Sequence, residues 1–182
     1  MRKQNIATIV ICAGVVAGLA TVFPIQKVDM NKTQNGRVGN NLAIYPDVPG
    51  AINPDVTQDN IKDTICKKGW TDTIRPPTIY TNKLKLEQLS DEDDKHMGTF
   101  EEDHEISLQL GGHATSTKNL WPQPYIIYSN GIRAGAREKD VAETALKREV
   151  CNGTITLQRA QEIITQDWFA CYLDIKDKKL CL

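Results

Sequence analysis

The feature that most constrains the fold is a short strand, loop and strand pattern in the second half of the chain. Phe100–Asp103 predicts one short strand, and Asn119–Trp121 predicts a second, which Pro122 ends. Gly111 and Gly112 lie between them and mark a turn or tight loop. This order predicts a compact hairpin whose loop is long enough to carry functional side chains.

Helical patterns surround the hairpin, so the expected fold class is α+β. Ala134–Val150 has helical spacing and is followed by Asn152-Gly153, a favourable helix end. Three other helices are predicted from a cap residue or from spaced apolar residues. The first runs from Thr57 to about Lys67, and the second covers Thr81–Ser90. The third follows the cap residue Thr156 and runs from Leu157 to about Trp168.

The hairpin holds residue types that suit hydrolysis of a phosphodiester. His104 can act as a general base, because its ordinary pKa lies near neutrality. Asp103 offers a hard oxygen ligand to a divalent cation, and the helix carboxylates Asp140 and Glu143 are candidates for a further ligand. Asn119 is predicted to orient the His104 ring from the facing strand.

The adjacent positions of Asp103 and His104 impose a geometric condition. Neighbouring residues of a regular strand point to opposite faces. Both side chains therefore reach one cation only if the strand breaks at this pair, with Glu105 already in the loop.

The first residues resemble an export signal. Arg2 and Lys3 precede an uncharged stretch, Ile6–Phe23, which fits either a cleaved signal peptide or an uncleaved membrane anchor. We therefore expect a signal or anchor over residues 1–23, a flexible linker over 24–52 and a folded domain over 53–182. The protein would be periplasmic, secreted or anchored facing outward, and would touch a membrane only through an uncleaved first segment.

The cysteine count agrees with export. Four cysteines remain after the first segment, namely Cys66, Cys151, Cys171 and Cys181. An even set in an oxidising compartment indicates two disulfides, with three pairings open, and four reduced thiols are the alternative. We favour Cys66–Cys151 with Cys171–Cys181, because the second pair closes a short C-terminal loop.

The formal net charge of −1 gives no overall field that would attract nucleic acid. Binding to nucleic acid would need a local basic patch or a metal ion.

Much of the chain resembles an exported bacterial group of HNH-like (ββα-metal) proteins. The resemblance spans roughly Asn53–Trp168, and its most specific parts are EEDHEISLQLGG, NLWPQP and KDVAETALKREVCNG. It implies a small ββα-metal core with flanking helices, which the disulfides predicted from the cysteine count would cross-link. It also implies an endonuclease that cleaves DNA or RNA with one divalent cation, Mg²⁺ or a transition metal, and without a small-molecule cofactor.

The sequence departs from the HNH pattern at one place. An HNH nuclease usually supplies a second metal ligand, His or Asn, from the helix after the hairpin, whereas this chain has no histidine after His113. The competing hypothesis is therefore a non-catalytic HNH-like fold that serves as an envelope or extracellular binding or structural module.

Overall fold

The computed structural model describes residues 44–90 and 93–181, and within them the fold is α+β. It contains small antiparallel hairpins, two long packed helices and two disulfides. Over the same residues, no helix combines the length and apolar character needed to cross a membrane. The predicted signal or anchor over 1–23, and the first part of the predicted linker, lie outside the described residues.

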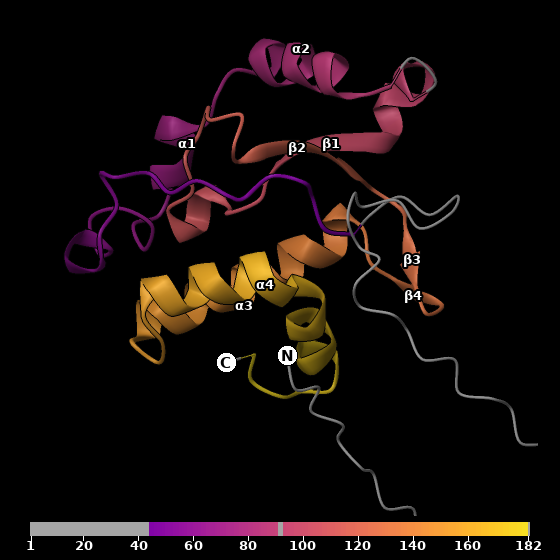
Figure 1. Ribbon diagram of the computed structural model, residues 1–182. Helices are drawn as coiled ribbons and strands as arrows, with labels where there is room; N and C mark the ends of the chain where they lie inside the picture. The colour runs from indigo at the N-terminus through magenta and orange to yellow at the C-terminus, as the bar shows by residue number, and fades with distance from the viewer. Residues whose placement is uncertain (1–43, 91–92, 182) are drawn as a thin grey trace, which may run out of the picture. The chain divides into compact units, whose positions relative to one another are not determined.

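The predicted hairpin is confirmed and is longer than expected. Strand β1 (Phe100–His104) pairs antiparallel with β2 (Leu120–Pro124), with Asp103 opposite Trp121. In Figure 1 this hairpin lies between helix α2 on one side and helices α3 and α4 on the other. The two faces of the hairpin are therefore covered by different helices. Successive side chains of β1 point to opposite faces, so they have different neighbours.

The loop between β1 and β2 depends on both glycines. Gly111 follows the 3-10 helix η4 (Leu108–Leu110) with φ +75°, a left-handed conformation that favours glycine. Gly112 is required for a different reason, because a Cβ atom there would lie 1.7 Å from the carbonyl oxygen of Ile106. The pair thus allows the loop to fold tightly back on the start of the hairpin.

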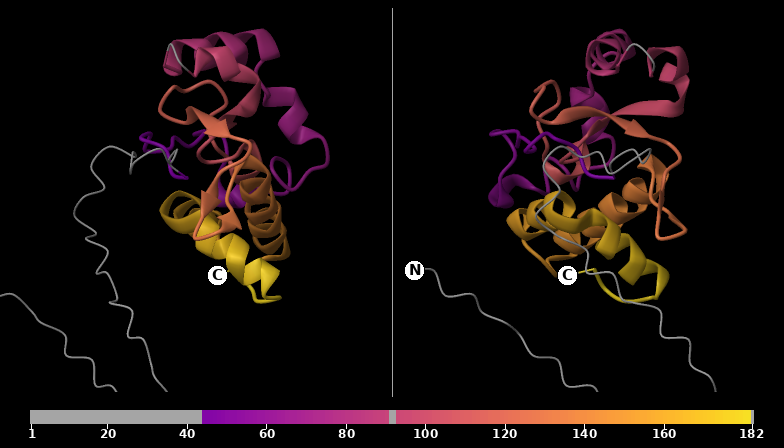
Figure 2. Two further views of the ribbon diagram at one scale, coloured as in Figure 1. Left: turned by 90° about the vertical axis from the view of Figure 1, so that its right-hand side faces the viewer. Right: turned by 45° about the vertical axis from the view of Figure 1, so that its right-hand side comes forward.

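Two long helices, α3 (Ala136–Asn152) and α4 (Leu157–Lys176), lie side by side and supply much of the core (Figures 1 and 2). The predicted cap Thr156 is confirmed, since its hydroxyl accepts a hydrogen bond from the Arg159 backbone. Helix α4 extends eight residues beyond the expected end at Trp168. Its backbone breaks at Asp167 (φ −160°), whose carboxylate caps the following segment by accepting from the Ala170 N–H.

A second, two-residue hairpin lies between β2 and α3. It consists of β3 (Tyr128–Ser129) and β4 (Ile132–Arg133), joined by Asn130 and Gly131, which both have positive φ. This is the type of turn that two-residue β-hairpins prefer.

The N-terminal helices differ from the prediction. The helix expected from Thr57 is only a 3-10 turn, η2 (Gln58–Asn60), followed by further turns. The side chain of Asn60 bonds to the Thr57 N–H, and the Thr64 hydroxyl bonds to the Asn60 carbonyl. Such local bonds between side chains and backbone compete with a regular helix.

The next two helices flank the proline pair. Helix α1 covers Trp70–Ile74, and α2 covers Thr78–Gln88, three residues earlier than expected at its start. Proline needs no N–H at a helix start, so Pro77 is well placed immediately before α2. Helix α2 contacts the hairpin through Lys85 Nζ, which donates to the Phe100 carbonyl at 2.8 Å.

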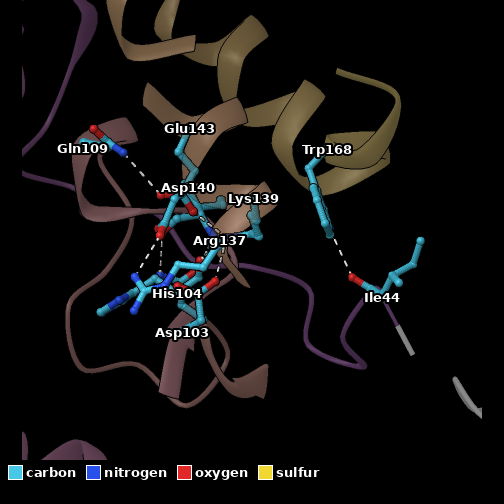
Figure 3. Close-up of polar contacts among 11 residues, drawn as sticks. Ile44, Asp103, His104, Gln109, Arg137, Lys139, Asp140, Glu143 and Trp168 are labelled. Carbon is cyan, nitrogen blue, oxygen red and sulfur yellow. Dashed lines mark hydrogen bonds and ion pairs between the residues drawn. The ribbon is translucent and has the colours of Figure 1, made fainter. Parts of the chain in front are cut away.

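The last residues of the predicted linker are packed, which corrects the linker boundary at 52. Tyr45 lies against Trp168 with ring centroids 6.2 Å apart, and the Ile44 carbonyl accepts from the Trp168 indole at 3.1 Å (Figure 3). Ile52 bridges to Gly112. Burial of aromatic surface outweighs the polar, proline-rich composition of this segment.

Both predicted disulfides are confirmed. Cys66–Cys151 joins the N-terminal turns to the end of α3, and Cys171–Cys181 closes the C-terminal loop. The first bridge connects residues 85 apart in sequence and the second connects residues 10 apart.

Candidate functional site

The first turns of α3 face the end of β1, and a lysine lies between them. Lys139 Nζ is 2.7 Å from Asp103 Oδ2, 2.6 Å from Glu143 Oε1 and 2.7 Å from the His104 carbonyl oxygen. Figure 3 shows these side chains converging from the hairpin and the helix. The Lys139 side chain is 0% exposed. Three oxygen atoms therefore satisfy the three N–H groups of a fully buried ammonium.

The position of Lys139 follows from the sequence of α3. It is aligned with Ala142, Leu146 and Val150 on the buried face of the helix, at spacings of three, seven and eleven residues. Glu143 lies one turn further on and belongs to the same face. The capping of α3 fixes this face, because the Glu138 carboxylate accepts from the Gly135 N–H at 3.0 Å.

The charges around Lys139 hold it in the protonated form. Burial by itself lowers the pKa of Lys139, but Asp103, Glu143 and Glu105 more than offset this and raise the pKa above its ordinary value. Burial raises the pKa of Glu105 to about 8, with the Asp103 charge adding to the effect and Lys139 opposing it. Burial also raises the pKa of Glu143 to about 7, with the Lys139 charge opposing the shift. Near neutral pH Lys139 is therefore an ammonium, and the Glu105 carboxyl is mostly protonated.

The second carboxylate partner of Lys139 is itself fixed. Glu143 is buried, and its other oxygen, Oε2, accepts from Gln109 Nε2 in η4 at 3.3 Å (Figure 3). Lys139 and Glu143 together thus join the hairpin, its loop and α3.

His104 has a different environment from Asp103. The strand stays regular through this pair, so the break in β1 that a shared cation would need is not found. The ring of His104 is buried, and its Nε2 lies 2.9 Å from the Ala114 carbonyl oxygen. Burial lowers the pKa of His104, while the Ala114 bond and the Asp103 charge oppose the shift. Because a carbonyl oxygen only accepts, Nε2 carries the proton of the neutral ring and Nδ1 keeps its lone pair.

Asn119 does not orient the His104 ring, which corrects the role expected from the sequence. Its Oδ1 accepts from the N–H groups of Ile106 and Ala51, and its Nδ2 donates to the carbonyls of Ile106 and His113. These four bonds use the full hydrogen-bonding capacity of the amide. Asn119 therefore fixes the loop backbone, and the Ala114 carbonyl orients the ring.

Asp140 does not join the group around Lys139. It is paired with Arg137 at 3.3 Å on the half-exposed surface of α3, as Figure 3 shows. Of the predicted ligands, Asp103 and Glu143 are brought together and Asp140 is not.

A divalent cation does not fit between Asp103 and Glu143 in this arrangement. The oxygens that would bind it are already bonded to Lys139 Nζ. An ion of charge +2 at ~4 Å from an ammonium would meet a repulsion of about 8 kcal/mol at an effective dielectric constant near 20. Among residues 44–90 and 93–181, no group of three or more His, Cys, Asp or Glu side chains is arranged to hold a metal ion.

Lys139 is the residue that sequence reasoning missed. A lysine on a helix usually lies on the solvated face. Its alignment with the apolar residues of α3, one turn before a glutamate on the same face, was the signal that could have identified it.

Comparison with protein-family models finds no match to this chain, and comparisons with curated proteins and with solved structures find none either.

Proposed function

We propose that this chain is an exported HNH-like endonuclease that hydrolyses phosphodiester bonds in DNA or RNA, with His104 as the general base. In this proposal β1, β2 and α3 correspond to the ββα-metal core. The observation that carries the proposal is the geometry of His104: its Nε2 is held by the Ala114 carbonyl at 2.9 Å. A neutral imidazole with a fixed tautomer is the state in which the other nitrogen can accept a proton from water.

Further features support parts of the proposal. A general base must be held in a fixed position. His104 lies in a hairpin whose loop is held in place by the two glycines and by the hydrogen bonds of Asn119. The disulfides support export, since such bonds persist mainly in oxidising compartments.

A second candidate function is a non-catalytic binding or structural module outside the cytoplasm. The observation that favours it is the buried contact of Lys139 with Asp103 and Glu143, which consumes the carboxylates a catalytic cation would need. In addition, Glu101 and Glu102 lie on β1 next to the site and would repel a phosphate when ionised.

Cleavage of supercoiled plasmid and single-stranded RNA tests the proposal. We expect the full chain to cleave at least one substrate, and His104→Ala to lower the rate at least ~100-fold, the usual contribution of a general base. His96→Ala is the matched control, because His96 is exposed in another segment and its loss should leave the rate unchanged. Reactions contain Mg²⁺, Mn²⁺, Ni²⁺, Zn²⁺ or a chelator.

Two results would count against the enzyme. Equal cleavage by wild type and His104→Ala would exclude His104 as the base. Absence of cleavage of both substrates under every condition, by protein whose melting curve is cooperative, would favour the non-catalytic module.

A further inference from the structure

We propose that the Lys139 ammonium is a built-in cation at the place where the hairpin and α3 would otherwise share a metal ion, and that the oxygens around it form a latent divalent-cation site. Cation binding at this place does not depend on whether the chain cleaves nucleic acid. It predicts that the wild-type protein needs no metal here, and that shortening residue 139 creates a site for one.

The groups around Lys139 are all oxygen donors. Two carboxylates and one backbone carbonyl, from Asp103, Glu143 and His104, point at one atom, Nζ of Lys139. Carboxylate and carbonyl oxygens are the ligands that hard cations such as Ca²⁺ and Mg²⁺ prefer. Lys139 therefore lies among oxygen donors of the kind a hard cation binds.

The spacing of these oxygens around Lys139 is close to that of a calcium site. The three N···O distances around Lys139 are 2.6–2.7 Å. Ca²⁺ binds oxygen at about 2.3–2.6 Å in flexible geometry, whereas Mg²⁺ requires about 2.1 Å in a near-ideal octahedron. Only a few tenths of an ångström separate the existing arrangement from a calcium shell, so Ca²⁺ is the cation that the latent site should accept most readily.

The charge of Lys139 balances the acidic side chains around it. Without the ammonium, the buried Glu143 and the partly buried Asp103 would lose their shared cationic partner, with Glu105 as a third carboxyl nearby. Oxygen Oε2 of Glu105 is buried and has no hydrogen-bond partner among the described residues, so no existing bond competes with an ion for it. A divalent cation would neutralise the pair of carboxylates directly.

The buried side chain of Lys139 also occupies the volume that an ion would need. The Lys139 side chain is fully buried, so its truncation to alanine opens a volume enclosed by the same oxygens. Methionine, by contrast, is unbranched and close to lysine in length, so it removes the charge and still fills the volume. The two substitutions therefore separate loss of charge from the opening of a site.

The test is the thermal unfolding of the full chain without nucleic acid, in chelator and in Ca²⁺, Mn²⁺, Mg²⁺ or Zn²⁺. We expect the wild-type Tm to change by less than ~1 °C, because nothing binds at Lys139. Lys139→Ala should melt far below wild type in chelator and rise by roughly 5–10 °C at a Ca²⁺ concentration about 100-fold above its Kd. Lys139→Met should be lowered similarly and should not respond.

A double variant identifies the ligands. Lys139→Ala combined with Glu143→Gln should lose most of the Ca²⁺-dependent rise, because one of the two carboxylates that contact Nζ is gone. A wild-type Tm that rises with a divalent cation, and no longer does so in Asp103→Asn, would overturn the proposal, since the ion would then displace the lysine. A Lys139→Ala protein that stays unfolded or unresponsive in all four cations would overturn the latent site.

Discussion

Lys139→Met lowers the free energy of unfolding by about 3–5 kcal/mol, because it leaves the charges of a buried group without their partner. The ammonium is fully buried and bonds to Asp103 and Glu143 at 2.7 and 2.6 Å. The variant preserves most of the side-chain volume, so the loss measures the charge and its hydrogen bonds. Urea unfolding at pH 7, followed by circular dichroism, gives the difference directly.

The chain contains a matched control for this substitution. Lys83 and Glu87 have the same four-residue spacing on a helix, but the Lys83 side chain is 79% exposed and the pair is 3.7 Å apart. Lys83→Met should therefore change the free energy of unfolding by no more than ~0.5 kcal/mol. Similar losses for the two variants would show that Lys139 is not a buried, bonded charge.

Removal of the Cys66–Cys151 bridge should also lower the free energy of unfolding strongly. Joining residues 85 apart restricts the unfolded chain strongly, and the loop-entropy relation gives a stabilisation of about 4.5 kcal/mol. The double variant Cys66→Ser/Cys151→Ser should lose about this amount in the same urea measurement.

The other bridge provides the comparison. Cys171–Cys181 closes a loop of 10 residues, for which the same relation gives about 2.7 kcal/mol. Cys171→Ser/Cys181→Ser should therefore lose less than the first double variant. The reverse order would show that the C-terminal bridge acts through native packing rather than through loop closure.

Local patterns predicted the parts of the fold that local forces decide. The hairpin follows from two short strands around Gly111 and Gly112, and each glycine has its own physical requirement in the loop. The cap at Thr156 and the turn at Gly153 define the junction of α3 and α4, because end signals act within a few residues.

Long-range contacts explain what the sequence did not reveal. Asn119 was expected to reach His104, yet its partners include Ala51, which is 68 residues away and which no local pattern connects to it. The packing of Tyr45 on Trp168 likewise joins distant segments, so composition alone assigned Tyr45 to a linker. Asp103 was expected to share a metal ion with Asp140 or Glu143, whereas the structure places Asp103 and Glu143 around the Lys139 ammonium.

The most direct test of the built-in cation is the protonation state of Lys139, observed by heteronuclear NMR of its side-chain ¹⁵Nζ. Its pKa is raised above the ordinary value of 10.5, so the stability it contributes is fully present below that pH and is lost only as the pH rises through the higher folded value. We predict an ammonium signal with slowly exchanging protons that persists at pH 10.5, where exposed lysines are half titrated. A Lys139 nitrogen that exchanges and titrates together with the exposed lysines would contradict the account.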